Sequence, residues 1–495
     1  MAASNADATM AVDSLRADAA ERVHCGGRPP SKRSCSRIIS TLAIAVAFVI
    51  AMVVAILRVR IALSTTPGHV RRTNFRVLIL TSSTGGGHNA AAAAIRCGIE
   101  ALSDKAEVLI VDLMKDHTPW PFRAFPALYE WLEEHPNMWR MTYFGSQYGA
   151  GQMMTTLAWM IARPAWAVFE TKRPHVIVSV HPMLQHSPIE LMRYNSLAPC
   201  SSEDLALPQE SASSQGKIVP RRRCLPFVTV VTDMETATNL WFHPAVTRVV
   251  VPSPALGAQA LRRGLQEEQI LHTESLLVHP DFGNVRRLDQ RRLREELGLG
   301  VDRRTVMLMG GGTGDARLAA FAHALRRVLP ADAAQLVVLC GRNNALRAQL
   351  QREFRGSVRG RAGVPVHVLD FRRDVPRWMR AADVLVTKAG PSTIAEALAV
   401  TLPVLLFGFL PGQERGNVAY VQRAGVGDYA PRPVQAARKV YSWLFGNDGA
   451  LELMRFRAAE QSHGLEATDM IAKLITELAL LQRTREVPEK AVFAP

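Results

Sequence analysis

The sequence contains little cysteine, with six cysteines among 495 residues. None lies in a Cys-x-x-Cys pair or in a Cys/His spacing typical of metal ligands, and the number is low for a disulfide scaffold. We therefore expect no metal centre and mostly reduced or buried thiols. Cys200 and Cys224 flank a loop-like stretch, and whether they pair in an oxidising compartment stays open.

Acidic residues are also in deficit, with 44 Asp and Glu against 59 Lys and Arg, which gives a formal net charge of +15. Nucleic acid and anionic lipid are both suitable partners for such a charge. Aromatic residues do not interleave the basic clusters, and no DNA-binding helix pattern is present. The charge therefore favours a membrane partner and argues against nucleic acid.

One stretch, residues 38–57, is almost entirely apolar and carries no charge over its twenty residues. A helix of that length spans about 30 Å, the thickness of a bilayer core. Basic residues flank it on both sides, so its orientation stays open. We predict a single transmembrane anchor at 38–57, after a disordered or targeting segment at 1–37 and before a linker at 58–74; a buried soluble helix is the alternative.

Strand-like and helix-like stretches alternate after residue 74, a pattern typical of a parallel sheet covered by helices on both faces. The pattern begins again after residue 300, where a second strand runs into glycines and a helix. We predict an α/β protein of two Rossmann-like domains, 75–275 and 276–450, that face one cleft. A Ser- and Pro-rich stretch at 196–224 is interpreted as a disordered insertion, and a helical segment at 451–485 is expected to pack back on the first domain.

The first glycine loop, Gly85–Ala90, fits the G-x-G-x-x-A fingerprint of dinucleotide sites, and Asp112 follows 22 residues after Ala90. An NAD(P)-dependent membrane oxidoreductase is therefore one alternative. His88 argues against it, because an imidazole is unhelpful beside a pyrophosphate. At a helix N-terminus the dipole disfavours the imidazolium, so His88 is a candidate general base. A local capping role is its other interpretation.

The second half contains three further candidate motifs. The loop "GGGTGDA" at 310–316 is expected to open a helix whose N–H groups hold a diphosphate. In "TKAGPSTIAEAL", at 387–398, a strand ends before a glycine turn and a helix, and Glu396 is placed to accept from a ribose hydroxyl. A role in the helix dipole is the alternative for Glu396. Polar residues of "FLPGQERGNVAY" either recognise sugar hydroxyls or form a solvated loop.

These motifs resemble those of a known family, the monogalactosyldiacylglycerol synthases, which are plastid glycosyltransferases with a GT-B fold. More distantly the chain is similar to the lipid-linked N-acetylglucosaminyltransferase of peptidoglycan synthesis. The resemblance runs from about residue 75 to 421, and its motifs are "STGGGHNAAAAAI", "HTPWPF", "WRMTYFG", "VSVHPMLQHSPI", "VTDMETATNLWFHP", "MGGGTGDA", "TKAGPSTIAEAL" and "LPGQERGNVAYV".

The resemblance implies transfer of galactose from UDP-galactose to diacylglycerol with inversion, with His88 as the catalytic base and no required metal or cofactor. The donor-binding residues that it implies are Gly311, Gly312, Phe371, Lys388, Gly390, Pro391, Ser392, Thr393, Glu396, Gln413, Glu414 and Asn417. The acceptor and cleft residues that it implies are Gly86, Gly87, His181, His186 and Asp233.

It further implies a plastid envelope or thylakoid membrane, with anionic lipid at the basic surface. Use of UDP-glucose or UDP-N-acetylglucosamine is an alternative within the same fold, and a non-catalytic nucleotide-sugar sensor is another. Oligomeric state, acyl preference and membrane orientation are not determined by the sequence.

Overall fold

The computed structural model describes residues 75–83, 86–118, 122–148, 166–206, 224–355, 363–446 and 449–485. The expected segments at 1–37, 38–57 and 58–74 lie outside these ranges, so the anchor stays a prediction. Within the described ranges, no helix combines the length and the apolar character that a membrane span requires.

The first domain is built on a six-stranded parallel sheet with the order β2-β1-β3-β6-β7-β8. Its strands are β1 (Phe75–Thr81), β2 (Ala106–Asp112), β3 (Val176–Ser179), β6 (Phe227–Val230), β7 (Arg248–Val251) and β8 (Ile270–His272). In β1, Val77 and Ile79 enter one apolar core, whereas Leu78 and Leu80 enter the core on the opposite face. Both faces of the sheet are therefore buried, as the continuous apolar run of this strand predicts.

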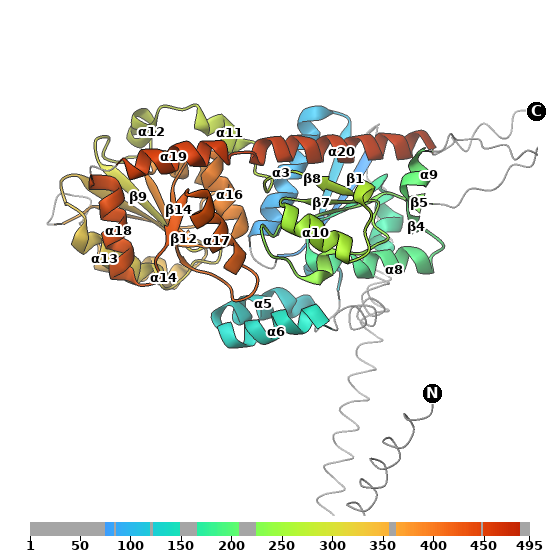
Figure 1. Cartoon of the computed structure of the whole chain (residues 1–495), viewed down its shortest axis with the longest axis horizontal. Helices are drawn as coiled ribbons and strands as arrows, with labels where there is room; N and C mark the ends of the chain where they lie inside the picture. Colours follow the sequence, from blue (N-terminus) through green and yellow to red (C-terminus); the bar gives the residue numbers. More distant parts are fainter. Residues whose placement is uncertain are drawn as a thin grey trace, which may run out of the picture. The chain divides into compact units, whose positions relative to one another are not determined.

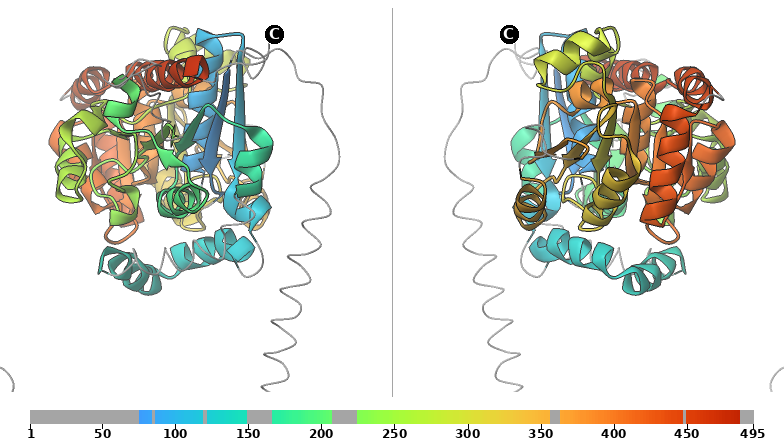
Figure 2. Two further views of the ribbon diagram at one scale, coloured as in Figure 1. Left: turned by 90° about the vertical axis from the view of Figure 1, so that its right-hand side faces the viewer. Right: turned by 90° about the vertical axis from the view of Figure 1, so that its left-hand side faces the viewer.

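Helices cover the two faces of this sheet (Figures 1 and 2). One face packs against α3 (Gly87–Leu102) and α20 (Gly464–Arg485). The opposite core contains residues of α4 (Leu113–His117), α8 (His186–Tyr194) and α10 (Pro254–Arg262). Helix α20 is the last described element of the chain and completes the core of the first domain. The expectation that residues 451–485 as a whole pack on this domain is wrong for α19 (Ala450–Glu460), because its Leu451 and Ala458 are buried in the cores of the second domain.

The second domain contains another six-stranded parallel sheet, with the order β11-β10-β9-β12-β13-β14. Its strands are β9 (Arg304–Met309), β10 (Ala334–Leu339), β11 (Val366–Leu369), β12 (Val384–Lys388), β13 (Val404–Gly408) and β14 (Gly427–Tyr429). One face packs against α13 (Leu318–Val328), α14 (Asn344–Glu353) and α18 (Pro433–Phe445). The other packs against α11 (Asp281–Arg286), α12 (Gln290–Glu296), α15 (Val375–Ala381), α16 (Pro391–Ala399), α17 (Arg415–Ala424) and α19 (Ala450–Glu460).

The strand orders locate the places where ligands are expected. Chain order reverses between β1 and β3 in the first sheet and between β9 and β12 in the second. Ligands of open α/β sheets bind beyond the carboxyl ends of the strands at such reversals. The first reversal leads into the His88 loop and the second into the Gly311 and Gly390 loops. Two parallel α/β domains with these sites form a GT-B-like architecture.

A helical hairpin of α5 (Phe125–Glu134) and α6 (Pro136–Tyr148) stands apart from the layers of both sheets (Figures 1 and 2). Leu132 and Trp139 of the hairpin pack against Leu410, which follows β13 of the second domain. The hairpin therefore belongs to the first domain in sequence but touches the second.

The predicted disordered insertion is ordered at both of its ends. Strands β4 (Ala198–Pro199) and β5 (Cys224–Leu225) pair in parallel, α9 (Ser202–Ala206) follows β4, and a disulfide joins Cys200 to Cys224. The expectation of disorder is therefore wrong for residues 196–206 and 224, because strand pairing and the disulfide tie them down. Residues 207–223 lie outside the described part of the chain.

Candidate active site

His88 lies in the first turn of α3, directly after the glycine loop that leaves β1. Its Nδ1 atom is 2.8 Å from the main-chain oxygen of Val180, which follows β3, and 2.9 Å from Oγ1 of Thr232. A carbonyl oxygen only accepts hydrogen bonds, so Nδ1 carries the proton and Nε2 keeps its lone pair. This tautomer suits a base that acts through Nε2. Gly86 precedes the helix, whereas Gly85 lies outside the described residues.

His88 is held neutral mainly by its surroundings. Loss of solvent lowers the pKa of His88 to about 4, and the hydrogen bond to Val180 opposes this shift. Burial therefore favours the neutral ring in addition to the helix dipole, from which the sequence predicts the same neutrality. At neutral pH the ring is uncharged and able to accept a proton.

His181 lies just after the end of β3 and packs against the imidazole of His88. Its side chain is buried, and its ring meets that of His88 at a centroid distance of 4.6 Å. Its Nδ1 lies 3.3 Å from the main-chain N–H of Met183. Burial, followed by the proximity of His88, lowers the pKa of His181 well below its usual value. Two neutral imidazoles therefore lie together at the reversal of the first sheet.

His186 belongs to a second pair rather than to this one. The centroid of its ring lies 4.9 Å from that of His243, which the sequence motifs do not mark as a site residue. Burial lowers the pKa of His243 to about 3. The motif "FHP" carries His243, but only the fold shows that it faces His186.

The glycine loop of the second domain is tightly packed. Gly314 has a φ of +80°, and a Cβ there would lie 2.0 Å from the main-chain oxygen of Cys340, so only glycine fits. Lys388 approaches the same loop, with its Cε 3.4 Å from the position of a Cβ on Gly311. Helix α13, however, begins only at Leu318. The prediction that the loop at 310–316 opens directly into a helix is therefore wrong, because the chain forms turns as far as residue 317 before α13 begins.

Helix α16 does begin where the sequence predicts, with Gly390 as its N-cap and Pro391 as its first residue. Ser392 follows, and its Oγ lies 2.8 Å from where a Cβ on Gly87 would stand. The N-terminal turns of α3 and α16 therefore meet across the two domains. A side chain at position 87 would therefore require the Ser392 hydroxyl to rotate away.

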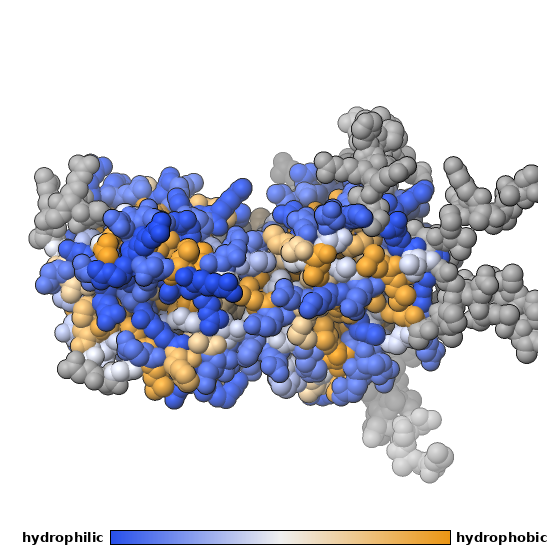
Figure 3. Space-filling model, turned by 90° about the horizontal axis from the view of Figure 1, so that it is seen from above, coloured by the Kyte–Doolittle hydropathy of each residue, from blue (hydrophilic) through white to orange (hydrophobic). Residues whose placement is uncertain are grey.

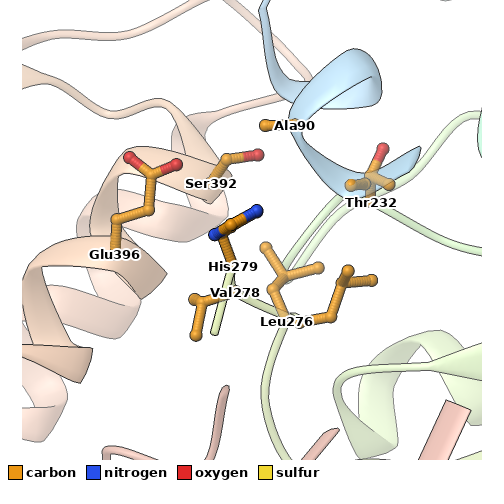
Figure 4. Close-up of a pocket in the computed structure, with 9 residues that line it drawn as sticks. Ala90, Thr232, Leu276, Val278, His279, Ser392 and Glu396 are labelled. Atoms are coloured by element: carbon orange, nitrogen blue, oxygen red, sulfur yellow. The ribbon is translucent and has the colours of Figure 1, made fainter. Parts of the chain in front are cut away.

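A small pocket opens at this meeting point. Ser392 and Glu396 line one side, with Ala90 and Thr232 on the other and His279 between them (Figure 4). Its full lining is Ala90, Ala91, Thr232, Leu276, Leu277, Val278, His279, Ser392 and Glu396. Loss of solvent raises the pKa of Glu396 to about 7. Thr232 thus lines the pocket of Glu396 and also contacts His88.

The polar residues after β13 make two kinds of hydrogen bond, one within the second domain and one to the first domain. Glu414 is buried and accepts the N–H of Leu410 at 2.8 Å, and Asn417 donates to the oxygen of Ala389 at 2.9 Å. Both of these contacts hold the loop together. Gln413 instead donates from Nε2 to Oδ1 of Asp233, at 2.8 Å, in the first domain. Asp233 therefore lies at the domain boundary.

Phe371 and Asp112 occupy positions away from this pocket. Phe371 is 45% exposed after the edge strand β11, with the guanidinium of Arg342 4.9 Å above its ring. Asp112 accepts the N–H groups of Ser83 and Lys115, at 2.8 and 3.0 Å. Because this carboxylate caps α4, the dinucleotide interpretation loses its ribose ligand. Within the described ranges, His, Cys, Asp and Glu do not gather in a group of three or more that could hold a metal ion.

Comparison with known proteins decides the family. The family model for monogalactosyldiacylglycerol synthase matches residues 88–200 and 212–273, and that for the glycosyltransferase family 28 C-terminal domain matches residues 305–431. The chloroplastic monogalactosyldiacylglycerol synthase of Spinacia oleracea is 35% identical over 420 residues, which cover 83% of this chain and 73% of that protein. This chain belongs to the monogalactosyldiacylglycerol synthase family. The chloroplastic monogalactosyldiacylglycerol synthase 1 of Arabidopsis thaliana is 34% identical over 429 residues, or 85% of this chain and 73% of that protein.

The resemblance seen in the motifs is thus confirmed, and the chain is a glycosyltransferase of the monogalactosyldiacylglycerol synthase family. Among solved structures, MurG of Acinetobacter baumannii covers 81% of this chain and 99% of its own, with a TM-score of 0.49 and 13% identity. These values are too low to decide the fold or the function, which rest on the observed topology and on the family.

Proposed function

We propose that this protein transfers galactose from UDP-galactose to diacylglycerol and inverts the anomeric centre. The relatives are monogalactosyldiacylglycerol synthases by name. The observation that carries the proposal is the arrangement around Thr232, which contacts His88 of the first domain and lines the pocket of Glu396 of the second. Thr232 thus lies next to both the proposed base of the first domain and the proposed nucleotide pocket of the second domain.

In the proposed reaction, Nε2 of His88 removes the proton of the diacylglycerol hydroxyl. The hydroxyl oxygen forms a bond to the anomeric carbon while the bond from that carbon to the UDP oxygen breaks. UDP leaves with the electron pair, and attack from the opposite face inverts the centre. The N-terminus of α16 and the ammonium of Lys388 stabilise the developing negative charge, and such fixed groups commonly contribute several kcal/mol.

We assign the remaining donor contacts by position. The diphosphate is placed between the Gly311–Gly312 turn and the first turn of α16, which contains Gly390, Pro391, Ser392 and Thr393. Glu396 accepts from the ribose, and the main chain near Phe371 is a candidate for the uracil. Gln413 contacts the galactose, with Glu414 and Asn417 supporting the loop.

The hairpin α5–α6 is proposed to meet the membrane that holds diacylglycerol. Its exposed large apolar residues are Leu128, Trp131, Met138, Met141 and Phe144. By contrast, the face that carries α19 and α20 is mainly hydrophilic, with apolar residues in separate patches (Figure 3). An aromatic and apolar hairpin with Arg140 beside Phe144 suits the headgroup region.

Location and lipid preference belong to the same proposal. The relatives named above are chloroplastic, so we place this enzyme at a plastid membrane, with residues 38–57 as its anchor. The net charge of +15 favours a surface that contains anionic lipid.

A lipid assay tests the proposal. The protein is incubated with diacylglycerol vesicles and, in separate reactions, UDP-galactose, UDP-glucose and UDP-N-acetylglucosamine. The expected product is a galactosylated diacylglycerol. Transfer from UDP-N-acetylglucosamine alone would reject the galactolipid function but keep the glycosyltransferase. Saturable NADH binding without UDP binding would instead support the oxidoreductase alternative.

A further inference from the structure

The loop that carries Gln413 belongs to the second domain but is held by the first. Leu410, at its start, packs on Leu132 and Trp139 of the hairpin α5–α6. Gly412 has a φ of +90°, and a Cβ there would lie 2.5 Å from the ring of Tyr143. The first domain therefore packs against this loop closely enough to determine its position.

Loop 233–236 of the first domain supplies polar contacts to the same loop. The hydroxyl of Thr236 donates to the main-chain oxygen of Gln413. Glu235 forms an ion pair with Arg423 of α17, with 3.4 Å between Oε2 and Nη2. The main chain and the side chain of Gln413 are thus both hydrogen-bonded to residues of the first domain.

Asp233 is the centre of these polar contacts. Its carboxyl group is buried at 4% exposure and accepts two hydrogen bonds, from Nε1 of Trp241 at 2.7 Å and from Nε2 of Gln413 at 2.8 Å. Trp241 is itself fully buried. Because the indole holds one carboxyl oxygen in place, the other oxygen is presented to Gln413 in a fixed direction. Burial raises the pKa of Asp233 to about 6, and both hydrogen bonds oppose this shift.

An ionised carboxylate accepts hydrogen bonds and donates none, so it selects one orientation of a neighbouring amide. The NH2 group of Gln413 must face Asp233, which leaves the amide oxygen and the second N–H for a ligand. We infer that Asp233 is a positioning residue that acts across the domain boundary, orienting the Gln413 amide so that it recognises hydroxyl groups of the donor sugar.

This inference deepens the proposed function and rests on it, since Gln413 is placed at the galactose by that proposal. It makes sugar recognition a joint property of both domains, whereas the nucleotide is bound by the second domain. UDP lacks the hexose that Gln413 would contact, so the binding of UDP is expected to be insensitive to Asp233. Selection between UDP-galactose and its epimer UDP-glucose depends on it.

The test is the variant Asp233→Asn in the full chain. The single amide oxygen of an asparagine accepts a hydrogen bond from either Trp241 or Gln413. The NH2 group of the asparagine then faces the other N–H donor and cannot accept from it. We expect the KM for UDP-galactose to rise by about tenfold and the preference over UDP-glucose to fall by a similar factor, as for loss of one charged hydrogen bond. The Kd of UDP stays within about twofold, which also shows that the variant is folded. An equal loss of UDP binding would overturn the inference.

A double-mutant cycle separates positioning from an independent role. If Asp233 acts through Gln413, then Asp233→Asn has little further effect on sugar affinity in a Gln413→Ala background. Fully additive losses would overturn the inference. Trp241→Phe is the matched variant, because it removes the donor to the other carboxyl oxygen and keeps the contact with Gln413. Its effect on the KM is expected to be smaller.

The cycle is read by calorimetric binding of UDP-galactose and UDP-glucose as well as by turnover. If the wild type binds neither sugar nucleotide, the proposed function fails. If it binds UDP-galactose and the cycle is additive, only the role of Asp233 fails. The two failures are therefore distinguishable.

Discussion

The imidazoles of His88 and His181 meet edge to face, with their ring planes at 71°. Burial lowers the pKa of both rings, and the proximity of His88 lowers the pKa of His181 further. A proton taken up by His88 during turnover is therefore held weakly and passes on readily. Such a site suits a base that must be neutral again before the next cycle.

Replacement of His88 removes the proposed base but leaves the proposed nucleotide pocket in place. We expect His88→Ala to lower kcat by ~10²–10⁴ while the Kd of UDP is unchanged. Steady-state kinetics with diacylglycerol and UDP-galactose, together with UDP calorimetry, measure both quantities. A kcat close to that of the wild type would remove His88 from the role of base.

We expect Glu396 to make donor binding depend on pH. Its pKa is raised to about 7, and a carboxylate accepts from a ribose hydroxyl only when it is ionised. UDP-sugar affinity should therefore rise as the pH increases, by about tenfold between pH 6 and pH 8. UDP-galactose without acceptor is the suitable ligand, because its diphosphate does not titrate in this range.

Glu396→Gln is the matched control, and its affinity for UDP-galactose should be weaker and much less dependent on pH, with only the small change near pH 6 that Asp233 contributes. His279 is the other titratable residue that lines the pocket, so His279→Gln should keep the pH dependence of the wild type. A flat profile in the wild type would contradict the assignment of Glu396.

The apolar face of the hairpin can be tested at Met141, which is 72% exposed on α6. Met141→Asp should raise the KM for diacylglycerol in vesicles by about tenfold, because insertion of this side chain into the interface contributes about 1.5 kcal/mol. UDP binding should be unaffected. Leu453→Asp, at a 50% exposed position on α19, is the matched control and should change neither value.

Asp383 is expected to be important for stability. Its carboxylate is 1% exposed and pairs with Arg294 at 2.7 Å and Arg455 at 2.6 Å. Removal of the carboxylate leaves a buried guanidinium without its partner. Asp383→Ala should therefore lower the free energy of unfolding by about 3–5 kcal/mol in urea titrations.

The exposed pair Glu190–Arg193 supplies the control, since Glu190→Ala should cost less than about 1 kcal/mol. Equal effects of the two substitutions would show that burial does not set the contribution of Asp383.

The disulfide between Cys200 and Cys224 joins residues 24 positions apart. Closing a loop of that length stabilises the fold by about 3 kcal/mol in the chain-entropy view. Mass spectrometry without reductant should find the linked peptides, and Cys200→Ser should lower the Tm only under oxidising conditions. An unchanged Tm with the bond present in the wild type would show that the chain ends of this loop are held by β4 and β5 alone.

Local features of the chain could be predicted from its residues. Continuous apolar runs such as that of β1 identify buried parallel strands, and the turn at Gly390 and Pro391 marks the start of α16. These predictions succeed because burial on both sheet faces and helix capping depend on residues close together in sequence. The start of α13 was missed, because the fold of the Gly311 turn depends on its packing against Cys340 and Gly341 of another strand end.

The sequence by itself determined two parallel α/β domains and the family. The tertiary structure alone decided that His88 bonds to Val180, that His186 faces His243, and that Asp233 reaches Gln413. Asp233 and Gln413 are separated by 180 positions in the sequence. Periodicity and capping act over a few residues, whereas contacts between domains depend on how whole layers pack, and no local pattern records that packing.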